Sequence, residues 1–170
     1  GRRLTSEVAK VVVPDSGVNI AGEDADPSAA AIAAEQLGSG AMAFVEDLSN
    51  PHAASELVQQ TKQKYGRIDV IVNNAAILRD EFIFKSNPEN WNAVLTNNLS
   101  AYFYMLNAAT PILRQQAKAD PAYEQGRIIN ITSTAGLSGN FGQSAYGSTK
   151  AGIFGLTRCV AHDMARSRIP

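Results

Sequence analysis

Three side chains in the C-terminal part of the chain could together move a proton: Ser133, Tyr146 and Lys150. Tyr146 and Lys150 are four residues apart in a segment that predicts a helix, and residues at this spacing lie on one face, one turn apart. A free phenol has a pKa of about 10, too high for efficient proton transfer at neutral pH. A nearby ammonium favours the phenolate and lowers that pKa. The pair therefore predicts a phenol tuned for acid–base work.

Ser133 ends the apolar run from Arg127, which predicts a buried strand. Its hydroxyl is expected at the carboxyl end of a sheet, where open α/β sheets bind their ligands. A hydroxyl, a tuned phenol and a lysine make a site for moving a proton to or from a carbonyl or alcohol oxygen.

These residues carry a resemblance to a known family. Ser133 followed by Tyr146-Gly-Ser-Thr-Lys150 resembles the active-site signature of the short-chain dehydrogenase/reductase family. Asn73-Asn74-Ala75-Ala76 resembles the family's Asn-Asn-Ala-Gly, with Ala76 in place of the usual glycine, and Asn98 matches the family's asparagine on the long helix before the catalytic strand. The motifs follow the family's order and spacing, and the resemblance extends from about Lys10 onward.

The resemblance implies an oxidoreductase that interconverts a secondary alcohol and a ketone by hydride transfer with NAD(P). Tyr146 would be the general acid/base, Lys150 would lower its pKa and hold the nicotinamide ribose, and Ser133 would hydrogen-bond the substrate oxygen. Asn98 would hold a water of a proton relay, and the alternative is a core asparagine with satisfied hydrogen bonds. The helix pair Tyr146–Lys150 could also be a mere surface pair.

Two loops narrow the expected substrate class. Gly139–Gln143 and Ile77–Asp80 are similar to family members that oxidise (3R)-hydroxyacyl-CoA thioesters. The small-molecule substrate would then be a 3-hydroxyacyl or 3-oxoacyl thioester. The alternatives to an enzyme are a catalytically inactive dinucleotide-binding module or a truncated fragment without activity.

The choice between NAD and NADP depends on Asp15, which follows the strand predicted over Lys10–Val13. An acidic residue there accepts hydrogen bonds from the adenosine ribose and repels a 2′-phosphate, which favours NAD. The alternative is that Asp15 only opens a turn with Ser16 and Gly17.

Further cofactor contacts are expected after the next two strands. In the family an Asp and an aliphatic residue flank the adenine, which points to Asp47 and Leu48, although Asp47 could instead cap the following helix. Asn73 and Ala75 either contact the cofactor or tie the strand end to its neighbours. The polar segment 14–28 is expected to be a solvated loop without a chemical role.

The alternation of strands and helices predicts a single α/β domain over residues 1–170, a Rossmann-like doubly wound parallel sheet in a three-layer α/β/α arrangement. Strands are expected at 10–13, 41–45, 68–72 and 127–133, with the apolar run 68–72 covered on both faces. Helices are expected at 28–37, 52–65, 88–116 with a kink at Pro111, and 144–167. The family's glycine-rich turn, Thr-Gly-x-x-x-Gly-x-Gly, is not found, although Gly1 could be its last glycine. The domain is therefore expected to be incomplete at both ends.

Composition excludes several classes of partner and site. A net charge of −1 with 18% charged residues gives no nucleic-acid surface. Cys159 is the single cysteine, so no internal disulfide forms, and its helical context predicts a packed side chain. His52 and His162 lack a ligand pattern, so no metal site is expected. No apolar stretch approaches the ~20 residues of a membrane span, and a cytoplasmic location is expected.

An aromatic stripe on the long helix predicts self-association. Tyr102, Phe103 and Tyr104 are expected to face outward from the helix over 88–116. Exposed apolar surface of this kind marks an interface. Because family members are often tetramers through this helix and the next, a homo-oligomer, either a dimer or a tetramer, is expected.

Overall fold

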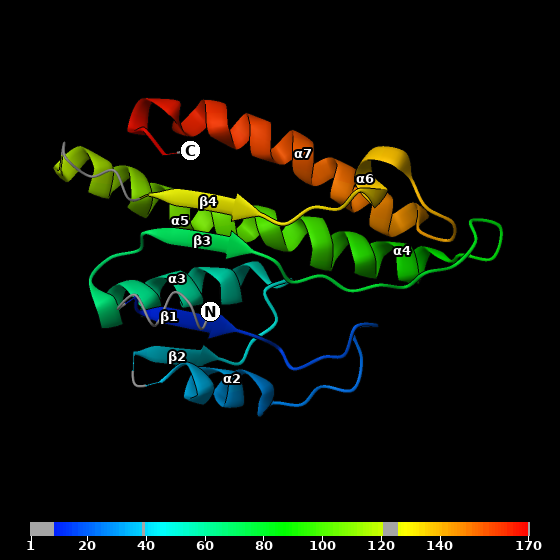
Figure 1. Cartoon of the computed structure of the whole chain (residues 1–170), viewed down its shortest axis with the longest axis horizontal. Helices are drawn as coiled ribbons and strands as arrows, with labels where there is room; N and C mark the ends of the chain where they lie inside the picture. The colour runs from blue at the N-terminus through cyan, green and yellow to red at the C-terminus, as the bar shows by residue number, and fades with distance from the viewer. Residues whose placement is uncertain (1–8, 39, 121–125, 170) are drawn as a thin grey trace.

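The computed structural model describes residues 9–38, 40–120 and 126–169. Within them run four parallel strands, β1 (Val11–Pro14), β2 (Ala41–Phe44), β3 (Val70–Asn73) and β4 (Arg127–Asn130). β1 pairs with β2, and β3 pairs with β4. In Figure 1 the pair β1–β2 lies apart from the pair β3–β4, with β1 and β3 as the facing strands, and the two pairs are not hydrogen-bonded to one another. Gly1, the residue considered for a glycine-rich turn, lies outside the described residues.

The helices follow the strands in the predicted order. They are α2 (Ala29–Leu37), α3 (Pro51–Tyr65), α4 (Pro88–Leu95), the π-helical segment η1 (Thr96–Ser100), α5 (Ala101–Ala119), α6 (Ala135–Ser138), α7 (Ser144–Met164) and the 3₁₀ turn η2 (Ala165–Ser167). Two of them begin with an asparagine cap and a proline in the first turn. The Asn50 side chain accepts the His52 N–H at 2.9 Å, and the Asn87 side chain accepts the Asn90 N–H at 2.7 Å.

Helices lie on both faces of β1 and β2, as the predicted three-layer α/β/α arrangement requires, whereas described helices cover only one face of β3 and β4 (Figure 1). Phe44 of β2 packs against Ala53 and Leu57 of α3, and Ile71 of β3 belongs to a cluster built from α3, α5 and the end of α7. The chain moves outward from β1 to β2 and then back across to β3, so right-handed crossovers put α2 and α3 on opposite faces. The main cluster contains Val58, Ile68, Ile71, Ala109, Leu113, Met164 and Ile169.

The prediction that the strand over 68–72 is covered on both faces is wrong for the described residues. Ile71 and Asn73 are buried, whereas Val70 and Val72, which alternate with them along the strand, are 46% and 49% exposed. The helices α3, α5 and α7 cover one face of β3 and β4. An apolar run shows that both faces can be buried, but it does not supply the element that covers the second face.

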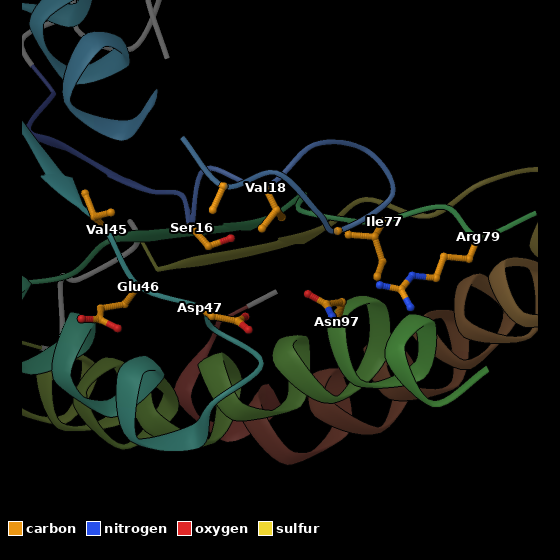
Figure 2. Close-up of a pocket in the computed structure, with 10 residues that line it drawn as sticks. Ser16, Val18, Val45, Glu46, Asp47, Ile77, Arg79 and Asn97 are labelled. Atoms are coloured by element: carbon orange, nitrogen blue, oxygen red, sulfur yellow. The ribbon is translucent and has the colours of Figure 1, made fainter. Parts of the chain in front are cut away.

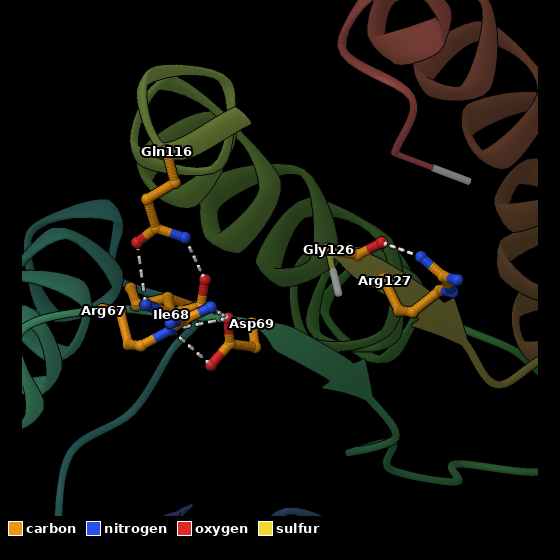
Figure 3. Close-up of polar contacts among 6 residues, drawn as sticks. All are labelled: Arg67, Ile68, Asp69, Gln116, Gly126 and Arg127. Atoms are coloured by element: carbon orange, nitrogen blue, oxygen red, sulfur yellow. Dashed lines mark hydrogen bonds and ion pairs between the residues drawn. The ribbon is translucent and has the colours of Figure 1, made fainter. Parts of the chain in front are cut away.

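The start of β3 is held by a side chain from the end of α5 (Figure 3). The Gln116 amide accepts the Ile68 N–H at 3.0 Å and donates to the Ile68 carbonyl at 2.6 Å. An ion pair between Arg67 and Asp69, 2.8 Å long, flanks this contact. The Arg127 N–H donates to the Asp69 carbonyl at 2.9 Å and begins the pairing of β3 with β4. These contacts fix the strands whose carboxyl ends carry the site.

The long helix expected over 88–116 is interrupted at η1 and then continues as α5 through Pro111 to Ala119. In η1 the Ala101 N–H donates to the Thr96 carbonyl, a bond over five residues that inserts an extra residue into the turn. Tyr102 lies four residues after the buried Asn98 and four before the buried Leu106, so helical spacing puts it on their face. Tyr102 is 2% exposed, so its predicted outward position is wrong, whereas Phe103 is 51% exposed.

Other features of composition can be compared with the structure. Cys159 is exposed on α7, so the prediction that it is packed is wrong. In the described ranges no group of three or more His, Cys, Asp and Glu could hold a metal ion. None of the helices in the part of the chain that the structure describes has the length and apolar character of a membrane span.

Candidate active site

Tyr146 and Lys150 lie on one face of α7, as predicted. The Lys150 ammonium nitrogen is 5.5 Å from the centre of the Tyr146 ring. Lys150 is only 2% exposed and donates a hydrogen bond to the Ile131 carbonyl at 2.9 Å. Burial disfavours the charged form and lowers the pKa of Lys150. A desolvated cation therefore lies beside the phenol.

Three contacts hold α7 against the segment after β4. The Asn130 amide donates to the Thr157 hydroxyl at 2.9 Å, and the Thr132 hydroxyl donates to the Lys150 carbonyl at 2.7 Å. Gly136 allows α6 to approach α7 closely, because a Cβ there would lie 2.6 Å from backbone atoms of Lys150 and Ala151. The position of the lysine thus depends on small and hydroxyl side chains around it.

Ser133 lies in the turn between β4 and α6, beyond the end of the strand rather than within it. Its hydroxyl oxygen accepts the Ala135 N–H at 3.2 Å. A Cβ on Gly147 would lie 3.0 Å from the Ala135 carbonyl oxygen, so the turn that carries Ser133 packs on the turn that carries Tyr146. The structure therefore brings the predicted catalytic segments together.

Asn98 is fully buried in η1 and its side chain is satisfied by backbone. Its amide oxygen accepts the Ile77 N–H at 2.8 Å, and its amide nitrogen donates to the Ile77 carbonyl at 2.9 Å. The Asn98 side chain is therefore that of a core asparagine with satisfied hydrogen bonds, which was one of the two alternatives predicted from the sequence. It ties the long helix to the segment after β3.

A cavity of about 360 Å³ lies at the carboxyl ends of β1, β2 and β3. Figure 2 shows the carboxylates of Glu46 and Asp47 on one side and the guanidinium of Arg79 at the other end. Its position is the one at which open α/β sheets bind ligands, and its size is at the low end for ligand pockets. The lining residues are Ser16, Val18, Gly22, Ala25, Val45, Glu46, Asp47, Ile77, Arg79 and Asn97.

Of the predicted cofactor residues, only Asp47 belongs to this lining. The Asp47 carboxylate accepts the Ser49 N–H at 2.8 Å and the Ser49 hydroxyl at 2.7 Å. The cap of α3 is Asn50, so Asp47 does not cap that helix as the alternative suggested. Leu48 packs against the cluster around Phe44.

The other predicted cofactor residues lie near the cavity's strand ends without lining it. Asp15 is exposed and accepts the Gly17 N–H at 2.8 Å, which is the turn considered as an alternative. Asn73 is 7% exposed and donates to the Asn130 side chain at 2.8 Å, tying β3 to β4. Ala75 is exposed.

The segment 14–28 lines the cavity, which the sequence reasoning did not predict. Many of its side chains are exposed, but the expectation that it is only a solvated loop is wrong. Gly17 and Gly22 both have φ of +82°, and the Asn19 side chain accepts the N–H groups of Ala21 and Glu23. The Asn and Gly residues at these positions are typical of turns and could have indicated a folded loop in the sequence.

Arg79 fastens this loop to the rest of the site. Its Nε donates to the Ala21 carbonyl at 2.9 Å, and its Nη1 donates to the Asn90 side chain at 3.1 Å. The Leu78 N–H donates to the Ile20 carbonyl at 2.7 Å beside it. The sequence analysis considered Arg79 only as a member of the segment 77–80. Its hydrogen bonds to the backbone of a distant loop could not be predicted from the sequence.

The two loops compared with hydroxyacyl-CoA members are joined to each other. The Gln143 amide donates to the Asp80 carboxylate at 2.7 Å, and the Glu81 N–H donates to the Gly142 carbonyl at 2.8 Å. Phe141 in this pair of loops is 90% exposed. The loops therefore form one unit next to the N-terminus of α7.

Comparisons with known proteins agree with this geometry. Residues 2–170 match the model of a family described as short chain dehydrogenase. The 3-oxoacyl-acyl-carrier-protein reductase of Synechocystis sp. is 39% identical over 140 residues, which cover 81% of this chain and 54% of that protein. The acetoacetyl-CoA reductase of Acinetobacter sp. is 40% identical over 123 residues, which cover 72% of this chain and 47% of that protein.

A solved structure gives the same result. The crystal structure of a short chain dehydrogenase from Mycobacterium avium superposes with a TM-score of 0.86 at 36% identity, covering 98% of this chain and 58% of that one. The chain thus spans about half the length of the curated relatives described above. By its sequence, its fold and the arrangement of Ser133, Tyr146 and Lys150, the chain belongs to the short-chain dehydrogenase family.

Proposed function

We propose that residues 1–170 form one nucleotide-binding domain of an NAD(P)-dependent oxidoreductase that interconverts a secondary alcohol and a ketone, with NAD favoured over NADP. The observation that carries the proposal is the buried Lys150 ammonium, 5.5 Å from the centre of the Tyr146 ring. A desolvated charge acts strongly on a neighbouring phenol because little water screens it. Membership of the short-chain dehydrogenase family supports the proposal.

Tyr146 is the general acid/base in this proposal. Its phenolate takes the proton of the alcohol in oxidation, and its phenol returns a proton to the carbonyl oxygen in reduction. Lys150 stabilises the phenolate and holds the nicotinamide ribose. Ser133 donates a hydrogen bond to the substrate oxygen and stabilises the charge that develops there. Asn98 holds η1 in place through its two hydrogen bonds to Ile77, so the proton relay proposed at Asn98 would use its backbone rather than its side chain.

The cavity supports the choice of cofactor. It lies at the carboxyl ends of three parallel strands and is lined by small and apolar side chains, two carboxylates and the Arg79 guanidinium. Asp15, Asp47, Leu48, Asn73 and Ala75, together with Tyr146 and Lys150, are the residues proposed to hold a nicotinamide dinucleotide, which supplies the hydride acceptor or donor when bound. The carboxylate of Asp15 disfavours a 2′-phosphate.

We propose 3-hydroxyacyl or 3-oxoacyl thioesters as the substrate class. Two relatives are named as reductases of 3-oxoacyl-acyl-carrier protein and of acetoacetyl-CoA. The joined loops at Asp80 and Gln143 lie at the N-terminus of α7, where they can form one wall of a substrate site. Phe103, half exposed on α5, supports a homodimer or homotetramer. A cytoplasmic location is proposed with this activity.

The proposal is tested by activity of the full-length protein with NAD⁺ and a panel of secondary alcohols that includes (3R)-hydroxyacyl-CoA thioesters. Tyr146→Phe should lower kcat by about 10²-fold or more, because the proton acceptor is lost. Tyr65→Phe on α3 is the matched control and should leave kcat unchanged. Full hydride transfer by Tyr146→Phe would show that Tyr146 is not the acid/base.

A further inference from the structure

The Lys150 ammonium has a second aromatic neighbour that the proposed mechanism does not use. The centre of the Tyr102 ring is 5.5 Å from the ammonium nitrogen, the same distance as the Tyr146 ring. Tyr102 comes from α5 and is 2% exposed, and Lys150 is 2% exposed as well. We propose that Tyr102 is a positioning residue that holds the Lys150 ammonium beside Tyr146 and keeps water away from it. This inference rests on the proposed function.

One backbone atom fixes both side chains. The Ile131 carbonyl accepts the Lys150 ammonium at 2.9 Å and the Tyr102 hydroxyl at 3.3 Å. A carbonyl oxygen has two lone pairs, so it can accept both bonds. Ile131 lies between β4 and Ser133 in the chain. The phenol of Tyr102 and the ammonium are therefore held by the segment that carries the proposed substrate hydroxyl.

The Tyr102 ring also affects the charge directly. An aromatic face attracts a cation, and the attraction is stronger when the pair is desolvated. A buried ring excludes water, so the ammonium acts on Tyr146 through a poorly screening medium. Without the ring, water reaches Lys150 and its side chain gains freedom. Both changes weaken the stabilisation of the Tyr146 phenolate.

Tyr102 keeps its proton while it performs this role. Burial, and then the charge of Tyr146, raises the pKa of Tyr102 to about 12. Its hydroxyl therefore continues to donate to the Ile131 carbonyl at neutral pH. Among the described residues, Tyr102 of α5 and Tyr146 of α7 are the titratable side chains whose contact with Lys150 the structure gives, and the segment after β4 contributes the Ile131 carbonyl.

The test follows the Tyr146 phenol itself, so it does not require turnover. The full-length protein is labelled with [¹³Cζ]tyrosine, and the Tyr146 signal, assigned by its loss in Tyr146→Phe, is titrated by NMR. Tyr102→Leu should move the midpoint upward by about one pH unit, because the phenolate loses part of its stabilisation. Tyr102→Phe keeps the ring and should stay within a few tenths of a pH unit of the wild type.

Tyr65→Leu is the matched control. Tyr65 also lies 5.5 Å from an ammonium, that of Lys64, and also donates to a carbonyl, that of Gly40 at 3.2 Å, but it belongs to α3. It should leave the Tyr146 titration unchanged. If Tyr102→Leu does not fold by circular dichroism, Tyr102→Met, which fills the site with a flexible side chain, takes its place.

Lys150→Met separates the two proposals. An upward shift in Lys150→Met together with an unchanged midpoint in Tyr102→Leu, or in Tyr102→Met where the leucine variant does not fold, would overturn the positioning role and leave the proposed function standing. An unchanged midpoint in Lys150→Met would overturn the role of Lys150 in the proposed function, and the inference with it. Upward shifts in Lys150→Met and Tyr102→Leu, with recovery in Tyr102→Phe, support the inference.

Discussion

Asn98 and Ile77 are joined by two hydrogen bonds between the asparagine amide and both backbone groups of the isoleucine, 2.8 and 2.9 Å long. Asn98 lies in η1, between α4 and α5, and Ile77 lines the cavity. The next helix, α5, begins at Ala101 and carries Tyr102, which contacts Lys150. The amide therefore links the cavity to the helix that holds Tyr102 beside Lys150.

Removal of this amide should cost both stability and activity. Asn98→Leu leaves the Ile77 N–H and carbonyl buried without partners, at about 1–3 kcal/mol for each group. We expect the free energy of unfolding in urea to fall by about 3 kcal/mol. Asn107→Leu, on the exposed side of α5, should change it by no more than about 0.5 kcal/mol. Equal losses in the two variants would contradict the role of the Ile77 contact.

Burial of Lys150 predicts a stability that depends on pH. Its pKa is lowered by burial, so the unfolded chain binds more protons than the folded chain between the folded pKa and about 10.5. Stability contributed by this group therefore rises with pH through that window, as the ammonium loses its charge. Lys150→Met removes the cost of the buried charge.

We expect Lys150→Met to be more stable than the wild type at pH 7, while it loses activity. The difference in unfolding free energy should shrink as the pH approaches 10.5, where the wild-type amine is neutral. Urea unfolding at a series of pH values measures it. A variant that is less stable than the wild type by a constant amount at every pH would show that the Ile131 hydrogen bond outweighs the desolvation of the charge.

Replacement of Arg79 should weaken binding of the dinucleotide cofactor. Arg79→Lys keeps the charge, but an ammonium cannot reproduce the two divergent bonds to Ala21 and Asn90. The loop over 16–26 should loosen, which raises the KM for the dinucleotide about tenfold at unchanged kcat, a loss of roughly 1.4 kcal/mol of binding. Faster amide hydrogen exchange in this loop should accompany the change. Arg114→Lys, exposed on α5, is the control, and a fall in kcat alone would contradict this role.

Asp15 sets the expected preference between the two dinucleotides. Asp15→Ser removes the charge that repels a 2′-phosphate, and a serine can still accept the Gly17 N–H that the aspartate accepts at 2.8 Å. The ratio of kcat/KM for NAD to that for NADP should fall about tenfold. Glu23→Gln removes a charge from the same loop and should leave the ratio unchanged. If the ratio of kcat/KM for NAD to that for NADP does not change in Asp15→Ser, Asp15 serves only to form the turn with Gly17.

The parts of the site that the sequence predicted are those set by local geometry. Tyr146 and Lys150 meet because helical spacing puts them on one face, and Ser133 follows β4 because an apolar run ends there. The layers and the parallel strands follow from the alternation of strands and helices, which the structure confirms.

The parts that the sequence did not predict depend on contacts between distant segments. Tyr102 shares the buried face of Asn98 and Leu106 at a spacing of four residues, but its contact with Lys150 depends on how α5 packs on α7. The loop over 14–28 lines the cavity because Arg79, more than fifty residues later, bonds to its backbone. Val72 is exposed although it belongs to the apolar run 70–72, since no described element covers that face.

One glycine substitution should be damaging and another favourable. A Cβ on Gly136 would lie 2.6 Å from backbone atoms of Lys150 and Ala151, which cannot move aside as a flexible side chain could. Gly136→Ala should therefore separate α6 from α7, displace Lys150 and lower both kcat and the melting temperature. On Gly155, in the interior of α7, a Cβ meets nothing within 4 Å.

Gly155→Ala should raise the free energy of unfolding by roughly 0.5–1 kcal/mol, because alanine loses less conformational freedom in a helix than glycine does. The two variants carry the same chemical change on helices that pack together. Opposite changes in their stability would therefore be due to the close approach of α6 to α7 at Gly136. Thermal unfolding and kcat measured side by side provide the comparison. A Gly136→Ala variant with wild-type kcat would mean that Lys150 is positioned by the Thr132 and Ile131 contacts alone.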